Sequence, residues 1–406
     1  MTVSKPVIED SGILLRFVWQ VEQLVITVSR IHEHKDGHVT GEIMIEKIGT
    51  DKSHLHQAQF NFSSSAARKG LAKQLTERYN TFEWIDILEQ LCAYTLRSLR
   101  KEEPVIELHS DMENVKPPEY MLYPLMPMYS PTALFGDGGS GKSYTALAIS
   151  ICLSLAWQEN KLGWRPRQDA VTTLYLDYET DENTIRWRLK KLTKGLGLSL
   201  SFLNYRRCSK RFVDDVDEIR KAIQSSQVGM IIIDSVGAAC AGDMNSAETA
   251  TQFFSALRSL NTTSLLINHQ SKNEFGQKTS YGSVYFRNYS RAEWQIKKTQ
   301  DVGEDTIEIG LFQTKANDDK LHSPLGYRLH FNQTVVSMER CDVADNPVLA
   351  QGLSLTKRIM ELLKHGKKQT KEIALELDAD ENTVKARLND GKKYFKHWED
   401  GWGLLQ

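Results

Sequence analysis

Hydrophobic and polar positions alternate in the first part of the chain and then change to a helical repeat. The strand-like alternation covers three runs, with a turn at 35–37 before the last of them: 13–18, 24–31 and 41–45. Two later segments, 66–78 and 84–99, place their apolar residues at helical spacing. We therefore expect residues 1–110 to form an α+β accessory domain with a small curled sheet.

In the middle of the chain, residues 124–340, short apolar runs alternate with helical segments. This order is typical of a mainly parallel α/β sheet flanked by helices. The strands expected after the first helix are 172–176, 202–205, 230–233 and 264–267. Three later runs are expected to be antiparallel strands: 292–298, 306–314 and 327–331. Segments 111–123 and 341–352 are the expected linkers on either side.

The last part, residues 353–406, contains three short apolar-periodic segments and then a hairpin. It resembles a winged helix-turn-helix, with these residues at capping and core positions: Thr370, Ile373, Ala374, Val384 and Leu388. Between residues 382 and 397 one acid, Asp390, faces five cations: Lys385, Arg387, Lys392, Lys393 and Lys396. Such an excess suits DNA phosphates. The alternative is a protein-docking module, because Asp378, Asp380 and Glu381 would repel phosphate at the start of the third helix.

A glycine-rich segment separates a strand-like run at 130–135 from a helical run at 144–155. Its sequence, GDGGSGKS, completes the G-x-x-x-x-G-K-[ST] pattern of a phosphate-binding P-loop. The glycines let backbone N–H groups turn toward phosphate oxygens, and the helix presents its positive end to the same anion. The expected nucleotide-binding set is Gly136, Asp137, Gly138, Gly139, Ser140, Gly141, Lys142, Ser143 and Tyr144.

The candidates for ATP binding and hydrolysis are two residues of this set and two acids. Lys142 is expected to neutralise the β- and γ-phosphates of ATP, and Ser143 to ligate Mg²⁺. The run 230–233 ends in Asp234, which would hold the metal shell from a strand tip. Glu179 follows the run 172–176 and is the candidate general base for the attacking water. Asp177 is its rival, while Asp181 and Glu182 are read as the start of a helix.

A third strand end and several cations complete the candidate set. His269 follows the run 264–267 and could sense the γ-phosphate; the alternative is a hydrogen-bonded structural histidine. Further cations could act as a finger that reaches a neighbouring subunit's site, or could be solvated surface charges. They are Lys272, Arg287, Arg291 and Lys315.

Bulk composition bears on the charge, the cysteine chemistry and the location of the protein more than on its activity. The formal charge of −1 gives no overall basic footprint, so DNA contact must come from local patches or from a channel formed on assembly. Five scattered cysteines without a C-x-x-C pair argue against a disulfide framework and a zinc ribbon. Histidines 32, 34, 38, 54 and 56 are read as solvated loop residues. The absence of a long apolar run or a signal-like start predicts a cytoplasmic protein without membrane contact.

Four motifs resemble the RecA-like ATPases of the RepA group, the hexameric replicative helicases of plasmids and phages. They are the P-loop, the LYLDYE strand ending in Glu179, the IIID strand ending in Asp234 and the NHQ strand with His269. The resemblance covers about residues 124–335. It implies that Glu179 activates water, that His269 senses nucleotide, and that Arg291, or Arg287 as its rival, reaches the neighbour's site. A departure is Gln270 after His269, where a second histidine or a threonine is often found.

Together, these features predict a RecA-like P-loop NTPase core with a catalytic set of Glu179, Lys142, Asp234, His269, Arg291 and Arg287. The expected function is an ATP- and Mg²⁺-dependent ring helicase, a homo-oligomer that translocates on single-stranded DNA, with duplex DNA as a further candidate partner. One alternative is a recombinase-like or loader ATPase that binds DNA without unwinding it. The other is an ATP-gated regulator that binds a specific duplex site.

Overall fold

The structure is a computed structural model that describes residues 3–10, 14–34, 36–49, 54–99, 107, 117–198, 202–271, 279–282 and 284–405. Several residues used in the sequence analysis lie outside these ranges: Ile13, Lys35, Lys272 and residues 111–116 of the first expected linker. The chain divides into two compact units, residues 1–115 and 116–406.

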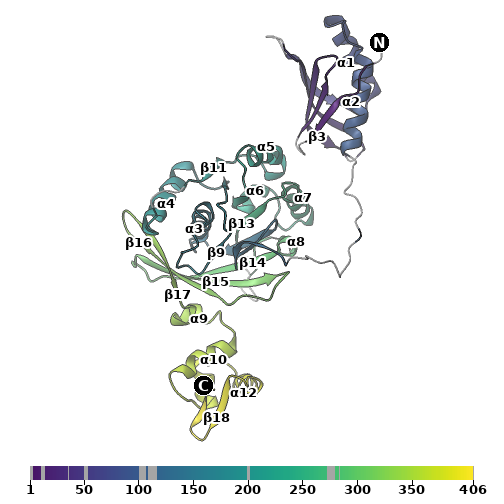
Figure 1. The fold of residues 1–406 in the computed structure, drawn as a ribbon. Helices are drawn as coiled ribbons and strands as arrows, with labels where there is room; N and C mark the ends of the chain where they lie inside the picture. The colour runs from purple at the N-terminus through teal and green to yellow at the C-terminus, as the bar shows by residue number, and fades with distance from the viewer. Residues whose placement is uncertain are drawn as a thin grey trace. The chain divides into compact units, whose positions relative to one another are not determined.

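The first unit is an antiparallel sheet with two helices. Its strands, in the order β1-β2-β3-β4-β5, are Val7–Asp10, Leu14–Trp19, Leu24–Glu33, Val39–Lys47 and His54–Asn61. Along β4 buried and half-buried residues alternate, as expected for a sheet covered on one face. The helices are α1 (Ser65–Arg78) and α2 (Trp84–Leu99) (Figure 1). Trp84, Ile87 and Leu91 of α2 are buried at helical spacing and share one core with the sheet.

The second unit is built on a nine-stranded mixed sheet with the order β11-β10-β12-β13-β8-β14-β15-β16-β17. The first five of these, in that order, are Asn204–Arg207, Thr173–Asp177, Met230–Asp234, Thr263–His269 and Pro131–Gly136. The remaining four are Ala292–Thr299, Thr306–Ala316, Leu325–Phe331 and Val336–Cys341. The strands from β11 to β14 are parallel, and β15, β16 and β17 continue the sheet antiparallel.

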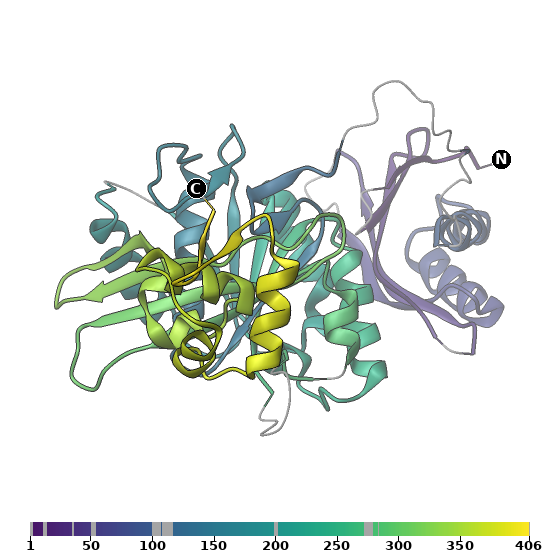
Figure 2. The ribbon, with the colours of Figure 1, turned by 90° about the horizontal axis from the view of Figure 1, so that it is seen from below.

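Helices cover both faces of this sheet (Figures 1 and 2). The helices are α3 (Lys142–Ser154), α4 (Glu182–Gly195), α5 (Phe212–Ser225), α6 (Val236–Cys240), α7 (Ala247–Arg258) and α8 (Val284–Tyr289). Met230 and Ile232 of β12 pack into the core under α3, whereas Ile231 and Ile233 pack into the core with α5 and α7. A strand buried on both faces reads as an unbroken apolar run, which is why MIII precedes Asp234.

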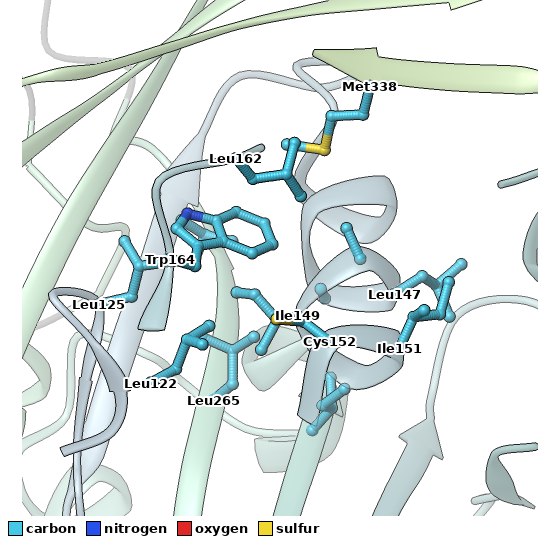
Figure 3. Close-up of a cluster of buried hydrophobic side chains, with 14 of the residues drawn as sticks. Leu122, Leu125, Leu147, Ile149, Ile151, Cys152, Leu162, Trp164, Leu265 and Met338 are labelled. Carbon is cyan, nitrogen blue, oxygen red and sulfur yellow. The ribbon is translucent and has the colours of Figure 1, made fainter. Parts of the chain in front are cut away.

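Helix α3 lies at the centre of the larger core. Leu147, Ile151 and Cys152 are fully buried there, and Trp164 and Leu162 approach the helix from a segment close to strand β9 (Figure 3). Strand β9 (Arg165–Pro166) belongs to a small antiparallel sheet with β6 (Tyr120–Tyr123) and β7 (Met126–Pro127). The P-loop helix is therefore fixed by apolar contacts along its length.

Two expectations about this sheet were wrong or incomplete. The run 292–298 was expected to be antiparallel, but β14 pairs in parallel with β8 and antiparallel only with β15. The connection from β13 to β14 passes through α8, and a helical crossover of this kind joins parallel strands. Strand β17 was not expected, because its sequence VSMERC buries only Val336 and Met338.

The chain after the sheet continues as short helices and a hairpin. A 3₁₀ turn at Val343–Asp345 and α9 (Pro347–Ala350) fall in the second expected linker. Then come α10 (Leu355–Lys364), α11 (Thr370–Glu376), α12 (Glu381–Asp390), β18 (Phe395–Trp398) and β19 (Gly401–Leu404). A core of its own joins these elements, with Ile359, Ile373, Val384 and Leu388 buried. No helix in the described ranges has the length and apolar character needed to cross a bilayer.

Candidate active site

The sheet register brings the candidate residues to one edge. Asp177 at the end of β10 is paired with Asp234 at the end of β12, and His269 at the end of β13 is paired with Gly136 at the end of β8. These strands are parallel and neighbouring, so their carboxyl ends form a single edge of the sheet. Ligands of open α/β sheets bind at this edge.

The P-loop curls between β8 and α3. Gly139 and Gly141 have φ angles of 66° and 85°, in the left-handed region that favours glycine. A Cβ on Gly136 would lie 2.5 Å from the carbonyl oxygen of Ile296, so a side chain cannot be accommodated without a backbone shift. Glycine is therefore needed at these positions for the loop to curl and for β14 to lie close to its start.

Lys142 is folded back onto this loop. Its Nζ donates to the carbonyl oxygens of Gly136 at 3.0 Å and Asp137 at 2.8 Å. Burial lowers the pKa of Lys142, while the nearby carboxylates of Asp234, Glu179 and Asp137 act in the opposite direction. The ammonium group is therefore held at the loop by acceptors that a phosphate could replace.

Ser143 and Asp234 meet at the base of the loop. Ser143 Oγ donates to Asp234 Oδ2 at 2.9 Å, and the Tyr175 hydroxyl donates to the same carboxylate oxygen. Asp234 is 6% exposed. Its burial raises the pKa of the carboxyl group, against the hydrogen bonds from Tyr175 and Ser143. Tyr175 was not singled out from the sequence, although its position two residues before Asp177 places it on the same strand face.

Glu179 and Asp177 have different surroundings. Glu179 Oε1 accepts a hydrogen bond from Ser235 Oγ and lies 3.4 Å from His269 Nε2, and both Glu179 and His269 are partly open to solvent. Asp177 is buried, and its two oxygens accept from the Glu179 and Thr180 backbone N–H groups, Thr180 Oγ1 and the Tyr205 hydroxyl. The structure therefore leaves Glu179 accessible and uses Asp177 to shape the turn.

Gln270 links the end of β13 to the P-loop. Its Nε2 donates to Asp137 Oδ1 at 2.7 Å, and its Oε1 accepts from Gln295 Nε2 of β14 at 3.0 Å. The sequence marked Gln270 only as a departure from the family pattern. No local signal could have found this contact, because it joins residues far apart in the chain.

The candidate finger cations lie at the opposite end of the strands. Arg291 donates its backbone N–H to Pro131 at the start of β8, and the next residue, Ala292, is paired with Thr132. From Pro131 to the P-loop the strand runs roughly 17 Å, at about 3.3 Å per residue, which is farther than an arginine side chain extends. Arg291 is exposed and, within the described part of the chain, forms no ion pair.

Arg287 and Lys315 are engaged near Arg291. Arg287 Nε lies 3.3 Å from Glu293 Oε2, and Glu293 is only 1% exposed. Burial raises the pKa of Glu293, while Thr314 and Arg287 lower it. Lys315 Nζ donates to three backbone carbonyl oxygens at the end of α8, those of Arg287, Asn288 and Ser290. These two side chains therefore have structural partners, whereas the Arg291 side chain has no such partner among the described residues.

The residues at the P-loop edge fit a Mg²⁺–nucleotide complex. Ser143 and Asp234 supply a hydroxyl and a carboxylate oxygen, the ligand types that Mg²⁺ prefers. Ser140 Oγ is buried and has no hydrogen-bond partner among the described residues, so the loop keeps a donor unused. Tyr144, the last residue of the expected nucleotide set, packs edge-on against Phe331 with the Arg188 guanidinium 5.9 Å from its ring.

Comparison with known proteins agrees with this geometry. Residues 98–274 match the family described as "AAA domain". The matched segment contains the P-loop, Glu179, Asp234 and His269. The match and the site together support a P-loop ATPase in this region, and its sheet is consistent with a RecA-like core.

Two further comparisons add little about activity. A solved KaiC-like protein from the hyperthermophilic archaeon Pyrococcus horikoshii is 13% identical, with a TM-score of 0.39 over 54% of this chain and 93% of that chain. A similarity this distant carries no functional argument. No curated protein matches the sequence.

Proposed function

We propose that this protein is a Mg²⁺-dependent ATPase motor that assembles into a hexameric ring and translocates on single-stranded DNA as a RepA-like replicative helicase. The observation that supports it best is the separation of charges on one sheet. Lys142, Asp234 and Glu179 lie at the carboxyl edge, whereas Arg291 lies at the amino edge. An arginine finger at the amino edge can reach only the active site of another copy, so a complete active site requires assembly.

The roles of the site residues follow from their contacts. Lys142 exchanges the Gly136 and Asp137 carbonyl oxygens for the β- and γ-phosphates of ATP. Ser143 and Asp234 hold Mg²⁺, which neutralises charge that develops on the phosphate oxygens. Glu179 orients the attacking water and takes its proton, since it is the accessible carboxylate beside the P-loop. Asp177 stays engaged in hydrogen bonds and orients the turn that carries Glu179.

His269 and Gln270 are proposed to report the state of the nucleotide. His269 is within 3.4 Å of Glu179, and Gln270 is bonded to the P-loop through Asp137. His269 ends β13 and Gln270 follows it, so a change at Glu179 or at the P-loop reaches the end of this strand through direct hydrogen bonds. Arg291 is the proposed finger in preference to Arg287, whose guanidinium neutralises the buried Glu293.

Residues 353–406 are proposed to form a winged helix. The order α10, α11, α12, β18, β19 supports this, as does an isolated bridge between Lys368 and Trp402, which ties the segment before α11 to the hairpin. This is the arrangement in which two helices of a helix-turn-helix are followed by a β-ribbon.

The experiment that tests the function compares ATP turnover with and without single-stranded DNA, and displacement of an annealed oligonucleotide. We expect single strands to stimulate turnover and ATP to drive displacement, with neither seen in Lys142→Ala. Stimulated turnover with homologous strand pairing but no displacement would instead indicate a recombinase or loader. Protection of one duplex sequence with little stimulated turnover would indicate a regulator.

A further inference from the structure

The cations of residues 353–406 fall into two groups. Three lysines are paired with acids of the same region: Lys364 with Glu361 at 2.5 Å, Lys367 with Asp400 at 2.9 Å and Lys368 with Glu376 at 2.6 Å. Seven others are exposed and form no ion pair within the described part of the chain, and two of these lie apart from the rest: Lys357, which donates to Ser323 Oγ, and Lys371. The other five lie between residues 385 and 396. They are Lys385, Arg387, Lys392, Lys393 and Lys396.

The five cations between residues 385 and 396 lie on α12, the turn after it and β18. Val384 and Leu388 face the core, so Lys385 and Asn389 lie on the outward side of α12. In β18, Phe395 is buried and Lys396 is exposed. The five residues thus come from α12, the turn at 391–394 and β18, whereas Lys357 and Lys371 lie on α10 and α11.

The acids at the start of α12 do not cancel this charge. Asp380 caps the helix, and its Oδ1 accepts from the backbone N–H and the hydroxyl of Thr383, both at 2.8 Å. These hydrogen bonds lower the pKa of Asp380 and keep it ionised at the first turn. The first turn is therefore unsuited to a phosphate group, and the unpaired positive charge lies on the later half of α12 and on β18.

We infer that α12 and the β18–β19 hairpin form a binding surface for duplex DNA. An α-helix fits the major groove of B-form DNA, which is about 12 Å wide. The outward residues Asn382, Lys385 and Asn389 carry groups that hydrogen-bond base edges, amides with adenine and lysine with guanine. The lysines around the start of the hairpin, Lys393 and Lys396, contact the phosphates on the side of the groove.

The aromatic residues of the hairpin favour a duplex over a single strand. Single-strand sites offer successive exposed rings on which bases stack. Here Trp398 and Trp402 are half-buried, and the Lys367 and Lys396 ammonium groups lie 4.8 and 5.5 Å from the centre of the Trp398 ring. Lys396 therefore lies beside the Trp398 ring and is exposed without an ion pair in the described part of the chain, whereas Lys367 is held by Asp400.

This inference deepens the proposed function, since it names duplex DNA as a second nucleic-acid partner of the motor. It does not depend on ATP turnover, because the surface lies on elements with their own core. Duplex binding measured without nucleotide can therefore fail while single-strand-stimulated ATPase persists, and the reverse can also occur.

The test uses the full chain and a pair of matched triple variants. Lys385→Ala/Lys393→Ala/Lys396→Ala removes three unpaired charges, and Lys364→Ala/Lys367→Ala/Lys368→Ala removes three paired ones. Fluorescence anisotropy with a labelled duplex and a single strand of equal length gives affinity as a function of salt. We expect the first variant to bind duplex about tenfold more weakly or worse and to lower the salt slope by about 2 to 3. The control should stay within about twofold of the unmodified protein.

Thermal melting and ATP turnover of both variants should match the unmodified protein, because all six side chains lie outside the core and the P-loop. Equal loss in the two variants would overturn the inference, since net charge alone would then explain it. Unchanged duplex binding would also overturn it, whether single-strand binding or binding of polyglutamate is lost instead; the latter result would make the surface a protein-docking site.

Discussion

Asp177 and Glu179 are separated by one residue, yet their carboxylates have different tasks. The Asp177 oxygens are occupied by backbone and hydroxyl donors, whereas Glu179 has one hydroxyl donor and an open side. We expect Glu179→Gln to retain ATP binding and to lower kcat by about 10²–10⁴, the range for loss of a general base. Binding of a fluorescent ATP analogue and steady-state turnover measure the two effects separately.

The matched control is Asp177→Asn, which changes the same chemical group two residues earlier. It should lower the melting temperature, because an amide cannot accept all four hydrogen bonds that the buried carboxylate accepts. The Glu179 variant should melt as the unmodified protein does. If Glu179→Gln kept full turnover, the base would have to be assigned to another carboxylate.

The P-loop glycines give a second test at the scale of single residues. In Gly136→Ala the new Cβ would meet the Ile296 carbonyl oxygen at 2.5 Å, and relieving that overlap costs about 1–3 kcal/mol. We expect ATP affinity to fall about tenfold or more. Gly138→Ala is the control, since its Cβ would meet nothing within 4 Å. Titration with an ATP analogue should separate the two, and equal affinities would contradict this account.

The residues that could be predicted from sequence are those marked by a local pattern. Lys142 and Ser143 lie in the P-loop motif, and Asp234 and Glu179 each follow an apolar run that ends at a sheet edge. Tyr175 and Gln270 also reach the site, but through partners 59 and 133 residues away. A single sequence does not state such pairings, since they depend on which strands become neighbours.

Among the elements, α4 is held against the far end of the sheet by close backbone contact. A Cβ on Gly195 would lie 2.0 Å from the Val336 carbonyl oxygen of β17. Gly195→Ala should push the helix away from the strand and destabilise the second unit by about 1–3 kcal/mol. A fall of several degrees in its melting temperature is the expected readout in calorimetry.

The control for Gly195→Ala is a helical glycine with free space around it. Gly70 lies in α1, is exposed, and has nothing within 4 Å of a built Cβ. Gly70→Ala should stabilise the first unit by about 0.5–1 kcal/mol, the gain in helix propensity. If both substitutions lowered stability alike, close packing of α4 would not be the cause.

The sheet of the second unit was only partly predictable from the sequence. Strands β10, β12 and β13 are apolar runs buried on both faces, and their pattern is unambiguous. Strand β17 mixes Glu339 and Arg340 with two buried residues and becomes a strand by pairing with β16 and lying beside α4. The direction of β14 follows from the crossover through α8, which periodicity alone does not encode.

For the whole molecule, the proposed finger role of Arg291 sets how the active sites of an assembly would be completed. It lies at the start of β14, whereas the P-loop follows the end of β8, the neighbouring parallel strand. If neighbouring copies meet head to tail, each lends its finger to one site and receives one for its own. We therefore expect Arg291→Ala to bind ATP normally and to have almost no turnover.

Mixing variants tests this arrangement directly. Lys142→Ala subunits lack a working P-loop but keep Arg291, so they can complete the site of an Arg291→Ala neighbour. With one neighbour served by each finger, an equal mixture should recover up to roughly a quarter of unmodified turnover. Lys142→Ala mixed with Glu179→Gln is the control, because the P-loop and Glu179 belong to the same subunit and no intact site can form. Rescue in the control mixture, or none in the first, would rule out a finger supplied by the neighbour.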